Sequence, residues 1–299
     1  LNQSEFWELP NNEKYIVLGH SHPECAYNDS LIPDFANLGS SGEAYLYSYV
    51  KLQKIIENNP QLKTVFIEYG TNNIDEVMSL WTWDDIHVSN NLPKYFAIID
   101  KEEMGVLWEN NSRSVLTIPP KTYIEEIGYN YYNSIFKENN FMSSRKRYGG
   151  YLHLVRDKTD SLIVARKPPK KHSEKPKDRK VSDINIYYLG KMLELCEQNE
   201  VQACLVRSPV HEFYSNPSKE EAYQNILRKN FPEATLLDFE KFPLENNQYG
   251  DFGHINHKGA EVFSRWFAEL LNNGLLEKED KQKFIDEAIE ARVHNGEQK

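Results

Sequence analysis

Ser21 and His254, at opposite ends of the chain, have the setting of a nucleophile and its base. Ser21 stands between His20 and His22, directly after the apolar run YIVL and a glycine. Near the other end, DFGH places Asp251 three residues before His254. A serine hydroxyl is activated when a base within hydrogen-bond reach takes its proton, and that base needs a third group to fix its tautomer. Ser21, His254 and Asp251 are therefore a candidate catalytic triad.

Donors for the negative oxygen of an acyl-transfer reaction follow two further predicted strands. The turn NLGSSGE contains Gly39 and Gly42, and the segment EYGTNN contains Asn72. A tetrahedral intermediate needs N–H groups aimed at its oxyanion, and one such donor is worth about 3 to 4 kcal/mol in the barrier. We expect the amide of Gly39 or Gly42, the side chain of Asn72 and the backbone amide of Ser21 to supply them.

Strands that alternate with helices are expected to bring these pieces together. KYIVLG and KTVFIEYG are short apolar runs that end in glycine, which is typical of buried parallel strands. Between these two runs, apolar residues recur at the intervals of a helix. The same alternation returns in the second half, where a helix is expected at 182–200 and a last amphipathic helix is expected to end at Gly274. A helical extension is expected at about 275–299. Open α/β sheets bind ligands at the carboxyl ends of their strands. The four pieces named above, which are the Ser21 segment, NLGSSGE, EYGTNN and the DFGH segment, are all expected at this edge.

The central part of the chain, about 75–180, breaks this alternation, and we expect a single domain of 1–299 that carries this large insertion. Residues 121–140 are expected to be helical. The stretch 145–180 holds thirteen Lys or Arg residues against four Asp or Glu residues, in a chain whose net charge is −10. Three prolines and few apolar residues at about 165–180 predict a mobile basic loop.

The composition excludes several classes of protein. With 39% hydrophobic and 27% charged residues, it is typical of a soluble globular protein, and no apolar run approaches the roughly 18 residues of a membrane span. The negative net charge argues against nucleic acid as a partner. Cys25, Cys196 and Cys204 are odd in number and lack Cys-x-x-Cys spacing, which argues against a disulfide framework or a thiolate zinc site. A single disulfide between Cys196 and Cys204 remains an alternative.

The four pieces, in this order, resemble the SGNH or GDSL-type hydrolases. Ser21 in GHSH matches the family's nucleophile, and a glycine of NLGSSG matches its oxyanion glycine. Asn72 in GTNN matches the family's asparagine, and Asp251 with His254 matches the closing Asp-x-x-His. The resemblance covers the N-terminal segment up to GTNN and a short stretch around DFGH. It implies a flavodoxin-like α/β fold, with a mostly parallel sheet in a three-layer α/β/α arrangement. The large insertion inferred from the break in alternation has no counterpart in this resemblance.

Two positions depart from the family pattern. His20 stands where the family has an aspartate before the serine, and Asn73 stands where it has an aspartate after the asparagine. Two carboxylates that usually support the site are therefore missing. RSPVHEFY, with His211, is similar to a Pro-x-His segment of some branches of the family. We expect His20, His22, Asn73 and His211 to line the substrate pocket.

The resemblance implies a serine-dependent esterase that removes or transfers an acyl group on a carbohydrate. We expect this acyl group to be acetyl. Neither a metal nor an organic cofactor is implied. The expected partner is a small-molecule or carbohydrate ester, and the basic loop is expected to contact anionic glycan or lipid headgroups. Because the sequence begins with Leu, an export signal or lipid anchor is expected to have been removed. The resemblance favours an exported bacterial protein of the periplasm or cell envelope, and a cytoplasmic one stays open.

Other interpretations of the same residues stay open. The protein could be a weak or inactive SGNH-fold protein that binds carbohydrate. It could also be a hydrolase in which His20 and His22, with Asp251, His254 or His257, bind a divalent metal. On an extended strand, side chains alternate, so the two histidines would face away from the serine and the two kinds of site would compete. A sharp turn at Gly19 would relax this constraint. Serine and asparagine after a strand are also ordinary turn residues.

Overall fold

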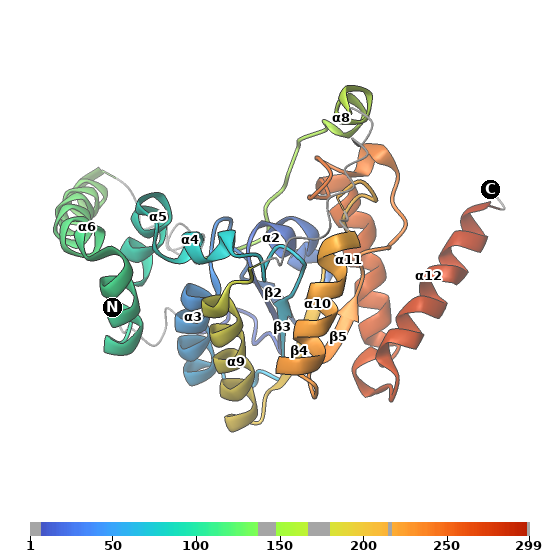
Figure 1. Ribbon diagram of the computed structural model, residues 1–299, viewed down its shortest axis with the longest axis horizontal. Helices are drawn as coiled ribbons and strands as arrows, with labels where there is room; N and C mark the ends of the chain where they lie inside the picture. The colour runs from blue at the N-terminus through green and yellow to red at the C-terminus, as the bar shows by residue number, and fades with distance from the viewer. Residues whose placement is uncertain (1–6, 137–147, 167–179, 215–216, 298–299) are drawn as a thin grey trace.

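The computed structural model describes residues 7–136, 148–166, 180–214 and 217–297. Its centre is a five-stranded sheet with strand order β2-β1-β3-β4-β5, in which every neighbouring pair is parallel (Figure 1). The strands are β1 Tyr15–Leu18, β2 Phe35–Asn37, β3 Thr64–Glu68, β4 Gln202–Arg207 and β5 Thr235–Asp238. This order is that of flavodoxin-like sheets. The predicted three-layer α/β/α fold class is confirmed.

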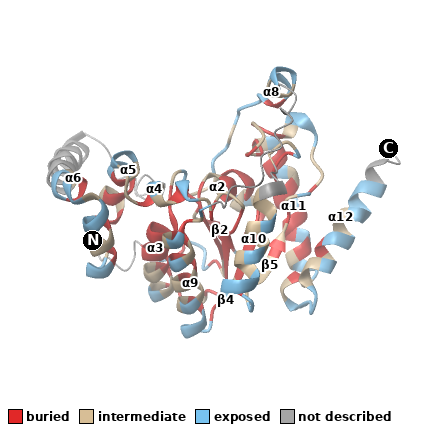
Figure 2. Ribbon diagram, in the orientation of Figure 1, coloured by how far each residue is buried: buried red, intermediate tan, exposed pale blue. Residues whose placement is uncertain are grey.

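Helices cover both faces of the sheet, and each face has its own apolar core. Ile16 and Leu18 of β1 point into one core and Val17 into the other, as strand alternation requires. Figure 2 shows the buried residues concentrated where the helices meet the sheet. The first core is covered by α3 Tyr45–Asn58, α9 Asp183–Gln198 and α10 Pro217–Asn230; the second by α2 Ser21–Ala26, α11 His257–Asn272 and α12 Lys281–Glu297.

The strand order creates a switch point between β1 and β3, since the chain leaves β1 towards one edge of the sheet and returns to extend the other. Ligands of open α/β sheets bind in the crevice at such a point, outside the carboxyl ends of the strands. Gly19 ends β1 with φ +143°, and a Cβ there would lie 2.5 Å from Glu68 Cβ. Only glycine combines this φ with so close an approach.

α2 begins at Ser21, immediately after this turn. The sharp turn at Gly19 thus removes the alternation that an extended His20-Ser21-His22 segment would have had. In a helix successive side chains are about 100° apart, so Ser21 and His22 can both border one crevice. Pro23 fits the first turn of α2, where its missing N–H would have no intrahelical partner.

The insertion is helical over most of its described length. It contains α4 Val77–Trp83, α5 Asp85–Tyr95, α6 Lys101–Phe136 and α8 Thr159–Ala165. The predicted helix at 121–140 falls within α6 as far as Phe136, and α6 is interrupted at Asn111, where φ is −154° and ψ is 64°. Residues 167–179 of the expected basic loop lie outside the described residues, and its mobility stays a prediction.

The C-terminal part of the chain closes the second face. Asn256 caps α11 by accepting hydrogen bonds from the Lys258 and Gly259 amides, and Gly274, with φ +77°, follows its end. In the described part of the chain, no helix has the length and apolar character needed to cross a membrane. The three cysteines are buried and free.

Candidate active site

Ser21, His254 and Asp251 form a continuous chain of hydrogen bonds at the carboxyl edge of the sheet. The Ser21 Oγ lies 2.8 Å from His254 Nε2, and His254 Nδ1 lies 2.8 Å from Asp251 Oδ1. With a proton on Nδ1, the ring donates to the carboxylate and accepts from the hydroxyl, which is the tautomer a general base needs. The three side chains are thus placed together, as their order and spacing predict.

Asp251 is held by more than the imidazole. Its Oδ1 also accepts the amides of Gly253 and His254, at 2.9 and 3.0 Å, and its Oδ2 pairs with Arg156. Burial raises the pKa of Asp251, but the hydrogen bond and charge of His254, the Gly253 amide and Arg156 outweigh burial and lower this pKa to about 2. The carboxylate therefore stays ionised at neutral pH and can stabilise a positive charge on His254.

The loop that carries these two residues is a tight turn supported from outside. The Gly250 amide donates to the His254 carbonyl at 2.8 Å, which closes the turn. A Cβ on Gly253 would lie 2.9 Å from the Tyr214 ring, so this ring packs directly against the turn. The His211 amide donates to the Phe252 carbonyl at 2.9 Å. The loop is fixed by its neighbours before any substrate arrives.

His20 and His22 are both buried beside the triad. The His22 ring makes edge contacts with His254 and Tyr214, at centroid distances of 5.1 and 5.4 Å. Burial and neighbouring imidazoles lower the pKa of His20 and of His22 to about 3. Both rings are therefore neutral at physiological pH, and neither supplies a fixed positive charge to the site.

The expected oxyanion donors are only partly available. Ser21 is the first residue of α2, so its amide has no intrahelical partner. Asn72 Nδ2 lies 2.9 Å from His20 Nε2, which uses one of its two hydrogens. The Gly39 amide already donates to Asn37 Oδ1 at 2.9 Å. Gly42, with φ +73°, lies beside α5, where its carbonyl accepts from Asn91.

Three of the four residues expected in the pocket have other surroundings. His20 contacts Asn72, and Asn73 is buried and accepts the Gly70 amide at 2.8 Å, so it shapes the turn after β3. His211 is 5% exposed and packs among aromatic rings, with Nε2 3.3 Å from Asn246 Oδ1. Of the four, only His22 lines the small cavity next to the triad, whose lining residues are His22, Glu68, Gly70, Thr71, Asn72, Arg207, Ser208, Val210, Tyr214 and Glu240.

Four residues at the site were not predicted from the sequence: Arg156, Glu68, Ser208 and Tyr214. Glu68, at the end of β3, is 1% exposed, and its two oxygens accept the hydroxyl and the amide of Ser208. Burial raises the pKa of the Glu68 carboxyl above its usual value, against the effect of Ser208. Glu68 and Ser208 follow apolar strand residues, a signal that could have identified both. Arg156 lies in the insertion, where the sequence offers no such signal.

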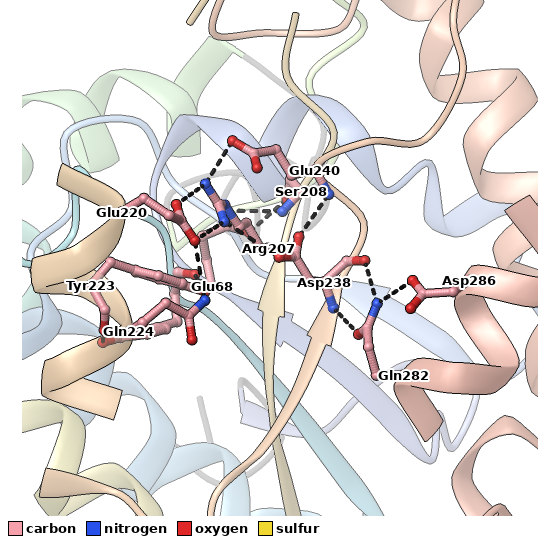
Figure 3. A network of polar contacts seen from close by, with 11 residues as sticks. Glu68, Arg207, Ser208, Glu220, Tyr223, Gln224, Asp238, Glu240, Gln282 and Asp286 are labelled. Atoms are coloured by element: carbon pink, nitrogen blue, oxygen red, sulfur yellow. Dashed lines mark hydrogen bonds and ion pairs between the residues drawn. The ribbon is translucent and has the colours of Figure 1, made fainter. Parts of the chain in front are cut away.

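Beside the triad, the ends of β4 and β5 carry a second polar cluster (Figure 3). Arg207 is 6% exposed and donates to Glu220 and Glu240 at 2.9 and 2.6 Å and to Asp238 at 3.3 Å. Its guanidinium lies over the Tyr223 ring. The three carboxylates surround one buried cation, so this cluster ties α10 and both strand ends together.

Metal ligation was the competing interpretation of the paired histidines. Among the residues that the structure describes, no group of three or more His, Cys, Asp or Glu side chains is placed to hold a metal ion. His20 instead bonds Asn72, and His257 Nδ1 lies 3.1 Å from the Leu154 carbonyl.

Comparisons with known proteins add little at this level of similarity. A search of curated proteins finds no match. One family model matches residues 155–276, less than half of the 299-residue chain, and its description names no activity. Among solved structures, the chain is similar to a protein of Bacteroides fragilis provisionally described as an acylhydrolase, with 13% identity and a TM-score of 0.37 over 91% of this chain and 93% of that one. The fold class rests on the sheet order instead.

Proposed function

We propose that the protein is a serine-dependent esterase of SGNH type that removes or transfers an acetyl group on a carbohydrate. The observation that carries the proposal is the hydrogen-bonded chain from Ser21 Oγ through His254 to Asp251. It lies at the switch point of a flavodoxin-like sheet, where ligands of such folds bind.

In the first half of the reaction, Ser21 Oγ attacks the carbonyl carbon of the ester while His254 Nε2 takes the hydroxyl proton. The ionised Asp251 holds the ring and stabilises its positive charge. When the tetrahedral intermediate collapses, the bond to the leaving alcohol breaks, and His254 returns the proton to that alcohol. The acyl group remains as an ester on Ser21.

In the second half, water or a sugar hydroxyl attacks the acyl-serine, and His254 removes its proton. Collapse of the second intermediate breaks the ester bond to Ser21, which recovers its hydrogen from His254. The same residues serve hydrolysis and transfer, so the acceptor alone distinguishes the two outcomes.

The oxyanion would be held by the Ser21 amide and by the second hydrogen of Asn72 Nδ2. Both groups belong to segments that border the switch point. The Gly39 amide could join them by sharing its hydrogen between Asn37 and the oxyanion, or after Asn37 Oδ1 has moved. Two donors plus a shared third predict a slower enzyme than one with three free amides, because each donor is worth about 10²-fold or more in kcat.

The acetyl part of the proposal depends on the resemblance to the SGNH family. The small cavity next to the triad is lined by His22, Asn72 and Tyr214 among others, and Ser21 is not one of its lining residues. The carbohydrate part of the proposal depends on the motifs shared with the SGNH family.

The proposal is tested by the hydrolysis of p-nitrophenyl acetate and p-nitrophenyl butyrate by the wild type and by Ser21→Ala. We expect the wild type to prefer the acetate and the variant to lose turnover while its circular dichroism and melting temperature stay unchanged. Retained turnover in a folded Ser21→Ala variant would refute the assignment of the nucleophile. A preference for butyrate would refute the acetyl specificity alone.

One observation favours a second candidate, a carbohydrate-binding protein of the same fold with little catalytic activity. Of the three groups expected to hold the oxyanion, the Gly39 amide and one hydrogen of Asn72 are already engaged. A fluorophosphonate probe separates the candidates, because it forms an adduct only with an activated serine. An adduct on Ser21 in the wild type supports the esterase, and its absence supports the binding protein.

A further inference from the structure

Part of the insertion returns to the sheet edge and crosses it as an extended segment. We call Tyr148–Lys158 the strap; it contains no helix or strand. Its backbone bonds three separate segments of the proposed site. The Gly150 amide donates to the Gly39 carbonyl at 3.0 Å, and the Leu152 amide donates to the Glu24 carbonyl at 2.8 Å. The strap thus joins the turn after β2 to α2, the helix that begins with the proposed nucleophile.

The second half of the strap bonds the loop that carries His254 and Asp251. The Leu154 carbonyl accepts the His257 amide at 2.9 Å, and the Lys158 amide donates to the Gly250 carbonyl at 3.1 Å. Between these two contacts, Arg156 pairs with Asp251 Oδ2. Every segment that contributes to the proposed triad, and the turn with Gly39, therefore bonds this one stretch of chain.

A buried lysine fixes the start of the strap. Lys51 of α3 is 0% exposed, and its Nζ donates to the Leu38 carbonyl at 2.6 Å and to the Tyr148 carbonyl at 2.8 Å. Glu43 balances its charge at 2.8 Å. A buried ammonium needs several acceptors, so this contact holds the strap and the turn after β2 at a defined separation.

Two adjacent glycines allow the strap to approach the turn. Gly149 has φ +129°, and a Cβ there would lie 2.4 Å from the Leu38 carbonyl oxygen and 2.6 Å from the Gly39 carbonyl oxygen. Gly150 has φ +152°, but a Cβ there would meet no atom within 4 Å. Both positions strain an alanine backbone, and only Gly149 also requires the space.

We infer that the strap is a positioning element, which holds the nucleophile helix, the turn with Gly39 and the histidine loop in their working arrangement. This inference rests on the proposed function for the identity of the three segments. Loops that carry functional groups are mobile unless a rigid support ties them down. A displacement of about 1 Å at a reacting group can cost about 10²-fold in rate, so a support shared by all three segments has a direct kinetic consequence.

The two glycines provide a matched pair for the test. Gly149→Ala and Gly150→Ala introduce the same methyl at a positive φ, but only the first pushes the strap away from the Leu38 and Gly39 carbonyls. We expect Gly149→Ala to lower kcat for p-nitrophenyl acetate about 10-fold to 100-fold, with KM little changed. Rates are normalised to the fraction of protein that reacts with a fluorophosphonate, so that unfolded protein does not count.

Amide hydrogen exchange gives a readout that does not depend on activity. The Ser40 amide donates to the Gly19 carbonyl at 2.9 Å, within the region that the strap covers. We expect its protection to fall at least 10-fold in Gly149→Ala and by less in Gly150→Ala, where alanine strains the backbone but meets no atom within 4 Å. Equal protection and equal rates in the two variants would overturn the inference.

Arg156 gives a second test. Its guanidinium pairs with Asp251 Oδ2, so its loss removes a contact that fixes the carboxylate beside His254. We therefore expect Arg156→Gln to lower kcat for p-nitrophenyl acetate with KM little changed, and Arg156→Lys to restore kcat in part.

The control is Arg265→Gln, because Arg265 is an exposed arginine of α11 that is paired with Glu261. Its kcat and KM should match those of the wild type. An unchanged kcat in Arg156→Gln would remove Arg156 from the positioning role. If the wild type neither hydrolyses the ester nor reacts with the probe, the proposed function fails, and the exchange measurement still decides whether the strap holds the segments.

Discussion

Two polar clusters share the carboxyl edge of the same sheet, and they differ in how completely their groups are paired. Around Arg207, one cation is surrounded by three carboxylates and an aromatic ring (Figure 3). Around Ser21, the chain of hydrogen bonds ends at a hydroxyl whose helix amide has no intrahelical partner. The first cluster is saturated, and the second, under the proposed function, keeps donors for a substrate.

Under the proposed function, the Arg207 cluster contributes stability and the Ser21 cluster contributes chemistry. Substitution of Arg207 would leave its buried carboxylate partners without a cation, so it should lower the free energy of unfolding. Substitution of Ser21 breaks few contacts within the folded protein, so it should lower activity with little loss of stability. The predictions below separate the two clusters on this basis.

The largest effect is expected for Ser21→Ala. Loss of the attacking hydroxyl should lower kcat/KM for p-nitrophenyl acetate by about 10⁴-fold or more, as is typical of triad residues. The free energy of unfolding should stay within about 1 kcal/mol of the wild type. Ser30→Ala, at an exposed serine, serves as the control and should retain full activity.

Arg207→Met should affect stability instead. The substitution leaves three carboxylates close together without their cation, and breaking a buried pair in this way typically costs about 3 to 5 kcal/mol. Urea unfolding measures the loss. Arg265→Met, at an exposed pair, should cost less than about 0.5 kcal/mol. Equal losses in the two variants would contradict the saturated character of the Arg207 cluster.

Acid should weaken the fold through the two buried histidines. Their folded pKa values, about 3, lie below the ordinary value of 6.5, so the unfolded chain binds protons that the folded protein does not. Stability from this source is present above the unfolded pKa and falls as the pH decreases. Between about pH 6.5 and 5.5 the two imidazoles together should cost about 2 kcal/mol. In NMR spectra their ring signals should not titrate in this interval, and titration there would contradict their burial as neutral rings.

Asp251 should give the smallest effect, at still lower pH. Its folded pKa, about 2, lies below the ordinary value of 3.8, so its contribution is present above the unfolded pKa and is lost as the pH falls through the folded one. From about pH 4 to pH 3 the loss should be about 1 kcal/mol. The difference in unfolding free energy between the wild type and Asp251→Asn should narrow over this interval. A constant difference would mean that Arg156 and His254 do not hold the carboxylate ionised.

The fold class could be predicted because its signals are local. Short apolar runs that end in glycine, and helices with apolar residues on one face, specify strands and helices from neighbouring residues alone. α6 shows the limit, since its path is broken at Asn111. The sequence left open whether the segment around Ser21 is extended or turned, because the turn at Gly19 depends on a close approach to Glu68 of another strand.

The sequence was enough to predict which residues meet at the site. It was less informative about which hydrogen-bond partner each atom has. Motif order and spacing indicated Ser21, His254 and Asp251, whose catalytic roles stay a prediction. The bond between the Gly39 amide and Asn37, and the aromatic packing around His211, depend on side-chain positions that no spacing encodes. Arg156 meets Asp251 across 95 positions, from a basic stretch that resembles a solvated loop.

The hydroxyl and the imidazole of the proposed triad are 233 positions apart along the chain. A nascent polypeptide leaves the ribosome with its nucleophile long before its base. Until the DFGH segment has emerged and closed over α2, the serine has no partner to take its proton. Under the proposed function, the protein would stay inert throughout synthesis, and hydrolysis of a chromogenic ester would report the completion of folding in time-resolved refolding experiments.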